Sequence, residues 1–165
     1  MIDPMTKLTE HFTLGEMCRS GRHPEIYNVP PLYKVDNIKL VCEWLERLRA
    51  LYGRRYNDGK DTPLYVNSGY RSAQLNHAVG GAKKSNHLNG SAADIRCPGK
   101  DAVERGIMAL RYATLLVEIF QFEQKAWDEI IIERKGTNWW VHFAVKPSGN
   151  GRYLTVINKT TYKTT

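Results

Sequence analysis

Two runs of β-forming residues near the C-terminal end constrain the fold more than any other part of the chain. The runs 129–134 and 139–145 are rich in Ile, Trp, Val and Phe, and the polar residues 135–138, which include a glycine, separate them. This pattern is typical of a β-hairpin. A four-residue loop pairs Ile131 with His142, so this part of the chain is predicted to form an antiparallel sheet.

Helical patterns precede the hairpin. Apolar residues recur at helical spacing over 35–52, with Gly53 as the expected C-terminal cap. Residues 101–122 are mostly apolar and also predict a helix, with a break near 112–114. Three further short strands are expected, at 64–67, 92–95 and 153–157.

Two short helices carry recognisable start signals. Thr13 is followed three residues later by Glu16, which is the pattern of a capping box. Ser72 is expected to cap a brief helix that runs to Val79 and ends at Gly80.

Together these elements predict an α+β fold, with helices packed against a small antiparallel sheet. At 165 residues and 42% hydrophobic composition the chain has the size of one domain, spanning 1–165. Residues 1–4 resemble a cloning remnant ahead of Met5, and 158–165 form a polar tail.

The charge and the cysteines narrow the function classes. The formal net charge of +7 favours an anionic partner, but the basic residues are scattered and no nucleic-acid-binding motif is present. Three widely spaced cysteines without a CxxC pair argue against a disulfide framework and a cysteine-based zinc site: Cys18, Cys42 and Cys97. We find no secretory signal and expect no membrane span.

The densest group of chemically capable residues lies at 85–94. His87 sits in a loop, small residues follow, and Asp94 falls on an expected strand seven residues later. Zinc is bound by imidazole nitrogen and carboxylate oxygen, and a catalytic site takes three protein ligands and leaves one position open. His87 and Asp94 supply two such ligands, and the third must come from elsewhere.

His142 interrupts the second hairpin strand and is the candidate third ligand. Because side chains alternate along a strand, Glu129 and Glu133 share its face in the predicted register. A carboxylate at this place suits a general base. A lone strand histidine is, however, often an ordinary core residue, and a strand-end aspartate is often a cap.

The motifs taken in order resemble the M15 peptidases, zinc D-Ala-D-Ala carboxypeptidases and related peptidoglycan peptidases that share a fold with hedgehog signalling domains. The resemblance covers roughly residues 10–147 and rests on four motifs: His11-Phe12-Thr13-Leu14-Gly15-Glu16, Ser68-Gly69-Tyr70-Arg71-Ser72, Ser85-x-His87-x-x-Gly90-x-Ala92-x-Asp94-Ile95 and Trp140-Val141-His142.

This resemblance implies residue roles. It makes His87, Asp94 and His142 the zinc ligands. Arg71 is implied to hold a substrate carboxylate or carbonyl charge, and Ser85 to support the first ligand and line the substrate site. Trp139 occupies the place where many relatives carry the acid, so Glu133 is the expected base, with two alternatives, Asp128 and Glu129.

The implied activity is zinc-dependent hydrolysis of peptide bonds in peptidoglycan, by a monomer that acts on the bacterial cell wall. Carboxypeptidase and endopeptidase action both stay open, as does host or phage origin. The alternative is a non-catalytic zinc-binding recognition module on the same scaffold. Neither His11 nor His77 is expected to bind the metal.

Overall fold

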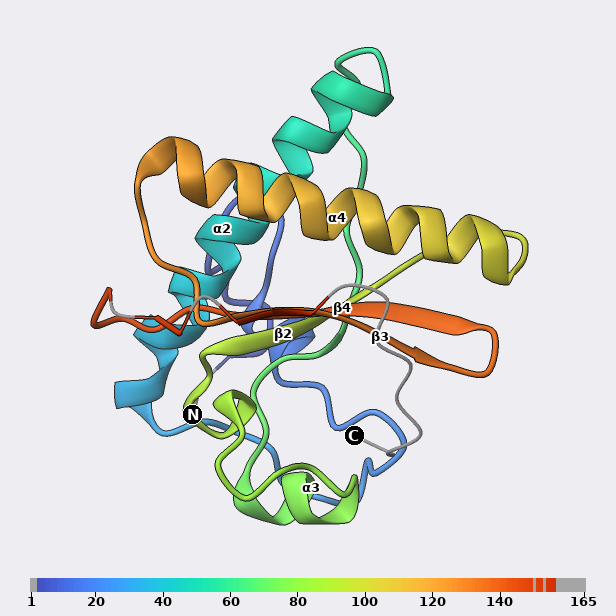
Figure 1. The fold of residues 1–165 in the computed structure, drawn as a ribbon. Coiled ribbons are helices and arrows are strands. Elements are labelled where there is room, and N and C mark those ends of the chain that lie inside the picture. Colours follow the sequence, from blue (N-terminus) through green and yellow to red (C-terminus); the bar gives the residue numbers. More distant parts are fainter. Residues whose placement is uncertain (1–2, 150, 153, 157–165) are drawn as a thin grey trace.

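Two long helices cover one face of the sheet in the computed structural model, which describes residues 3–149, 151–152 and 154–156 (Figure 1). Helix α2 runs over Leu32–Tyr56 and is longer at both ends than the apolar spacing predicted. Gly53 lies inside it, so the expected cap there is wrong; the helix ends at Tyr56, and Asn57 is its C-cap. A Cβ at Gly53 would meet the Lys60 carbonyl oxygen at 2.4 Å, so the glycine permits the chain to fold back closely.

Helix α4 runs unbroken over Ala102–Glu123, so the predicted break near 112–114 is wrong. Tyr112 and Ala113 are buried against the core, and this packing outweighs the lower helix propensities of Tyr112 and Thr114. The Asp101 side chain caps the first turn by accepting a hydrogen bond from the Glu104 amide at 2.9 Å.

The sheet has the strand order β1-β2-β4-β3-β5, with β1 over Val66–Ser68, β2 over Ala92–Arg96, β3 over Glu129–Lys135, β4 over Asn138–Ala144 and β5 over Leu154–Val156. The pairs β1–β2, β2–β4 and β3–β4 are antiparallel, and β5 is parallel to β3. The α+β prediction is confirmed. The ends of the predicted strand 153–157 lie outside the described residues, as does the predicted tail 158–165.

The hairpin register is the predicted one, with Ile131 opposite His142. Lys135 also pairs with Asn138, so the turn is shorter than the four residues expected and consists of Gly136 and Thr137. Gly136 has φ +61°, a conformation that favours glycine in such a tight turn.

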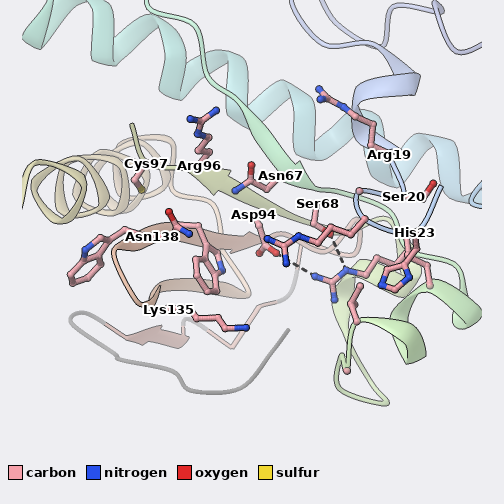
Figure 2. A pocket seen from close by; sticks show the side chains of 18 of the residues that line it. Arg19, Ser20, His23, Asn67, Ser68, Asp94, Arg96, Cys97, Lys135 and Asn138 are labelled. Atoms are coloured by element: carbon pink, nitrogen blue, oxygen red, sulfur yellow. Dashed lines mark hydrogen bonds and ion pairs between the residues drawn. The ribbon is translucent and has the colours of Figure 1, made fainter. Parts of the chain in front are cut away.

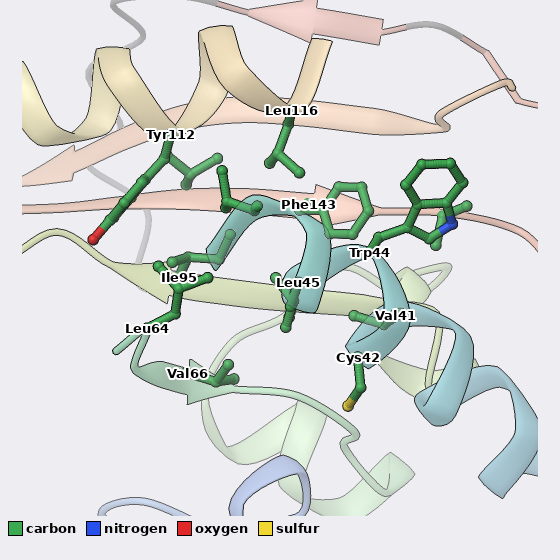
Figure 3. Packing of buried hydrophobic residues seen from close by; sticks show 14 of the residues in the cluster. Val41, Cys42, Trp44, Leu45, Leu64, Val66, Ile95, Tyr112, Leu116 and Phe143 are labelled. Carbon is green, nitrogen blue, oxygen red and sulfur yellow. The ribbon is translucent and has the colours of Figure 1, made fainter. Parts of the chain in front are cut away.

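The core lies between the two long helices and the sheet. The Trp44 and Phe120 rings stack with centroids 3.9 Å apart and join α2 to α4. Figure 3 shows Phe143 of β4 and Ile95 of β2 pointing from the sheet into this layer. Because these residues occupy the helix-facing side, their strand neighbours face the other side of the sheet.

Three short elements lie on that other side or at its edge: α1 (Leu14–Met17), α3 (Ala73–Ala78) and the 3₁₀ helix η1 (Asn86–Asn89). Thr13 and Glu16 form the predicted capping box, and Ser72 accepts the predicted cap hydrogen bond from the Leu75 amide at 3.1 Å. Figure 1 shows α3 and its loops on the sheet face opposite α4. No helix in the described part of the chain is long and apolar enough to cross a membrane.

Candidate metal centre and cleft

His87 is held in place by the short helix η1 that contains it. The Ser85 hydroxyl accepts a hydrogen bond from the His87 amide at 3.2 Å, and Gly90 ends the turn with φ +73°. The His87 ring is buried, with its Nδ1 atom 2.6 Å from the Gly69 carbonyl oxygen. A carbonyl only accepts, so Nδ1 carries the proton and Nε2 is left with a lone pair that points into the site.

Asp94 lies at the middle of the group because β2 pairs with β4. Asp94 is directly opposite His142 in that pair. One carboxylate oxygen, Oδ1, is 3.3 Å from His87 Nε2 and 3.0 Å from His142 Nδ1. The structure therefore brings together the three residues that the sequence suggested, and their ligand atoms all lie within 4.8 Å of one another.

The electrostatics of the group favour positive charge between these side chains. Burial works against ionisation of Asp94, yet the charges and hydrogen bonds of His87 and His142 lower its pKa. Burial likewise disfavours the His142 imidazolium, but Asp94 and Glu129 outweigh it and raise the pKa of His142 to about 10. A metal ion must displace this proton from His142, and the same carboxylates that favour the proton also favour a metal cation.

Glu129 orients the His142 ring from the side away from Asp94. Its Oε1 atom is 3.1 Å from His142 Nε2 and accepts a hydrogen bond from Asn86, and Oε2 is 2.9 Å from Arg152 Nη2. This arrangement leaves His142 Nδ1 as the nitrogen that faces the metal position. The alternation of side chains along the strand predicted that Glu129 shares a sheet face with His142. Nothing in the sequence indicated its contacts with Asn86 and Arg152.

Asp128 is fully buried and does not reach the ligand group. It accepts hydrogen bonds from Asn86 at 2.7 Å and from the Arg152 backbone amide at 3.2 Å, and it is 3.5 Å from Lys146. These contacts tie the end of the hairpin to the loop that carries His87.

Glu133 lies on the same strand face, one alternation beyond Ile131. Its Oε2 atom accepts a hydrogen bond from the Trp140 indole at 2.6 Å. Glu133 lines the same cavity of about 280 Å³ as His87, Asp94 and His142. The Glu133 carboxylate is therefore part of the wall of the candidate metal site, and the hydrogen bond from Trp140 holds it in position.

Arg71 is buried, and each arm of its guanidinium is occupied. Nε donates to Ser68 Oγ at 2.9 Å, Nη1 to Asn76 Oδ1 at 3.3 Å and Nη2 to Asp94 Oδ2 at 3.3 Å. Burial lowers the pKa of Arg71, and the charges of Asp94 and Glu133 oppose that effect. The guanidinium thus fixes the orientation of Asp94 as well as lining the cleft.

The remaining histidines and Ser85 occupy separate places. Ser85 lines the smaller cavity at the end of η1. His11 pairs with Glu46 at 2.7 Å on the outer side of α2. His77 is exposed on α3 and lines a second, larger cavity of about 870 Å³.

The two cavities adjoin at Arg71 and Asp94, which line both of them, whereas His87 and His142 line only the smaller one. Together they are named the cleft, with a larger and a smaller part on either side of Arg71 and Asp94. Figure 2 shows the larger part, with Asp94 between side chains that come from well-separated segments.

A scan against protein-family models matches residues 10–117 to the family described as Peptidase M15. The chain belongs to the M15 peptidase family. The family match identifies the chain as a peptidase. Its His87–Asp94–His142 group could hold a metal ion. No curated protein matches the sequence.

The M15 match contains Arg71, His87 and Asp94 but ends before the hairpin. Glu133 and His142 therefore join the site through the fold, because the β2–β4 pairing sets His142 opposite Asp94. The segment that matches the M15 family contains two of the three candidate metal ligands, and the β2–β4 pairing brings in the third, His142.

Proposed function

We propose that this M15 member is a zinc-dependent peptidase that hydrolyses peptide bonds in peptidoglycan. The observation that carries the proposal is the combination of three converging ligand atoms with a separate carboxylate, Glu133, in the same cavity. Peptidoglycan as the substrate follows from the resemblance of the motifs, and the place of action is then the bacterial cell wall.

The donor set suits zinc. Two imidazole nitrogens and one carboxylate oxygen are ligands that a catalytic zinc site uses. Around a tetrahedral ion with bonds of about 2.1 Å, neighbouring ligand atoms lie roughly 3.4 Å apart. The 3.3 Å and 3.0 Å separations between Asp94 Oδ1 and the two histidine nitrogens are close to this spacing.

The chain's own residues divide the remaining work. When bound, zinc acts as a Lewis acid that makes water nucleophilic near neutral pH and polarises a peptide carbonyl. Glu133 takes the proton from the attacking water and returns it to the leaving amine. Arg71 and Glu129 orient Asp94 and His142, so that the ligand geometry is set before substrate arrives.

The test combines metal content with turnover. Purified peptidoglycan is digested with and without a chelator, and released fragments are identified by mass spectrometry, which also shows whether terminal or internal bonds are cut. We expect release only with metal. The variant Glu133→Gln should keep stoichiometric zinc and lose kcat by about 100-fold or more. Full activity in that variant would exclude Glu133 as the base, and release in the presence of the chelator would exclude the metal mechanism.

A further inference from the structure

The larger part of the cleft carries an excess of positive charge. Among the described residues, five arginines and one lysine line it, against a single carboxylate, Asp94: Arg19, Arg22, Arg71, Arg96, Arg105 and Lys135. Asp94 is already paired with Arg71 and the two histidines. The smaller part of the cleft, by contrast, has the carboxylates of Glu129 and Glu133 beside its basic residues.

The sheet places two of these cations at regular steps from the metal centre. Arg96 follows Asp94 by two residues on β2, so both side chains start from the same face, and Arg96 pairs with Trp140. Lys135 pairs with Asn138, which is four residues from His142 on β4. A strand rises about 3.3 Å per residue, so these cations start roughly 7 Å and 13 Å along the strands from the ligands.

Two further arginines of the same cavity come from another part of the chain. Arg19 and Arg22 come from the loop after α1, and Figure 2 shows Arg19, Arg96 and Lys135 reaching the larger cavity from three separate segments. In the part of the chain that the structure describes, Arg19, Arg22, Arg96 and Lys135 form no ion pair. Their charges are thus available to an anionic ligand, and a concave wall strengthens the field that such a ligand meets.

We propose that this basic groove, lined by Arg19, Arg22, Arg96 and Lys135, selects a substrate peptide that carries free carboxylates on one side of the scissile bond. A cavity of about 870 Å³ has room for an extended segment of several residues. An extended peptide advances about 7 Å every two residues, so carboxylates two and four residues from the scissile bond match the steps to Arg96 and Lys135. This specificity rests on the proposed hydrolysis at the adjacent metal centre.

The experiment uses pairs of synthetic stem-type peptides that differ only in carboxylate or carboxamide groups, placed in turn on each side of the scissile bond. For the zinc-loaded protein, we expect KM to rise about two- to fivefold for each carboxylate amidated on one side, with kcat nearly unchanged. Added salt should reduce this preference because it screens exposed charges.

Two exposed variants locate the effect. Arg96→Gln and Lys135→Gln should each lower the preference for carboxylate over carboxamide, measured as the ratio of the two KM values. Arg54→Gln is the matched control, since Arg54 is exposed near the end of α2 and lines neither cavity. Equal KM values for carboxylate and amide peptides, or an Arg54→Gln effect as large as the other two, would overturn the proposal.

Binding separates this proposal from the proposed function. If no peptide is cleaved, the hydrolysis proposal fails, and fluorescence polarisation of the same labelled peptides still measures the groove. Tighter binding of the carboxylate form, lost in Arg96→Gln, supports the groove in that case. If inorganic polyphosphate instead displaces the peptide at far lower concentration and binding depends on the same arginine, the groove serves a phosphate polymer and the peptide assignment is wrong.

Discussion

Glu129 is predicted to hold His142 in the metal-binding orientation, and the substitution Glu129→Gln tests this. The glutamine carbonyl can still accept from His142 Nε2, which lies 3.1 Å from Oε1. Its amide group, however, replaces the oxygen that lies 2.9 Å from Arg152, and the negative charge is lost. The variant therefore removes the charge beside the imidazole with little change in shape.

The size of the effect follows from the burial of this contact. The Glu129 side chain is 15% exposed, so solvent screens its charge only partly. A hydrogen bond to a charged group contributes about 1.5–3 kcal/mol. Partners that orient a ligand change metal affinity by about 10–100-fold, which corresponds to about 1.4–2.7 kcal/mol. Both routes give a zinc affinity one to two orders of magnitude lower.

The assay is a competition titration of zinc between the protein and a chromophoric chelator. Glu118→Gln is the control, because it makes the same chemical change at an exposed ion pair with Arg55 on the outside of the helices. Zinc affinity in Glu129→Gln equal to that of this control would refute the orienting role. Unchanged zinc affinity with abolished turnover would make Glu129 the base in place of Glu133.

Three further outcomes follow from the structure. His142→Ala should abolish stoichiometric zinc binding while circular dichroism stays that of the folded chain; full zinc content by mass spectrometry would remove His142 from the ligand set. Phe120→Ala should lower the free energy of unfolding by about 3–5 kcal/mol in urea denaturation, because its fully buried ring stacks on Trp44; a loss below about 1 kcal/mol would contradict that packing. Burial raises the pKa of the Cys97 thiol to about 12, so it stays protonated at pH 8 and should react with iodoacetamide only after unfolding; rapid labelling of the native chain would show the thiol to be accessible.

Local patterns predicted the parts of the site that depend on short stretches of chain. The hairpin register followed from two β-rich runs and a short turn, and it put Glu129, Glu133 and His142 on one face. The capping signals at Thr13 and Ser72 are likewise local and are confirmed. These features involve neighbours in sequence or a single strand pair, where spacing alone determines geometry.

The rest depends on contacts between distant segments. The strand order that sets β2 beside β4 is not written in any one stretch of sequence, and neither is the helix packing that keeps α4 continuous through Tyr112. Arg71 looked like a free clamp for substrate, but its partners Ser68, Asn76 and Asp94 come together only in the fold. Long-range partners decide whether a charged side chain orients a ligand or meets a substrate.

The two glutamates of β3 illustrate how one strand face can carry two different tasks. Glu129 and Glu133 lie on either side of Ile131, which is opposite His142. Glu129 faces His142, Asn86 and Arg152, so its oxygens are committed to holding other side chains. Glu133 lines the same cavity as the metal group and accepts a hydrogen bond from the Trp140 indole, and its charge acts on Arg71. A carboxylate that moves a proton must be able to exchange partners during the reaction. Glu129 is committed to holding His142, and this favours Glu129 as the residue that orients the ring and leaves Glu133 as the base.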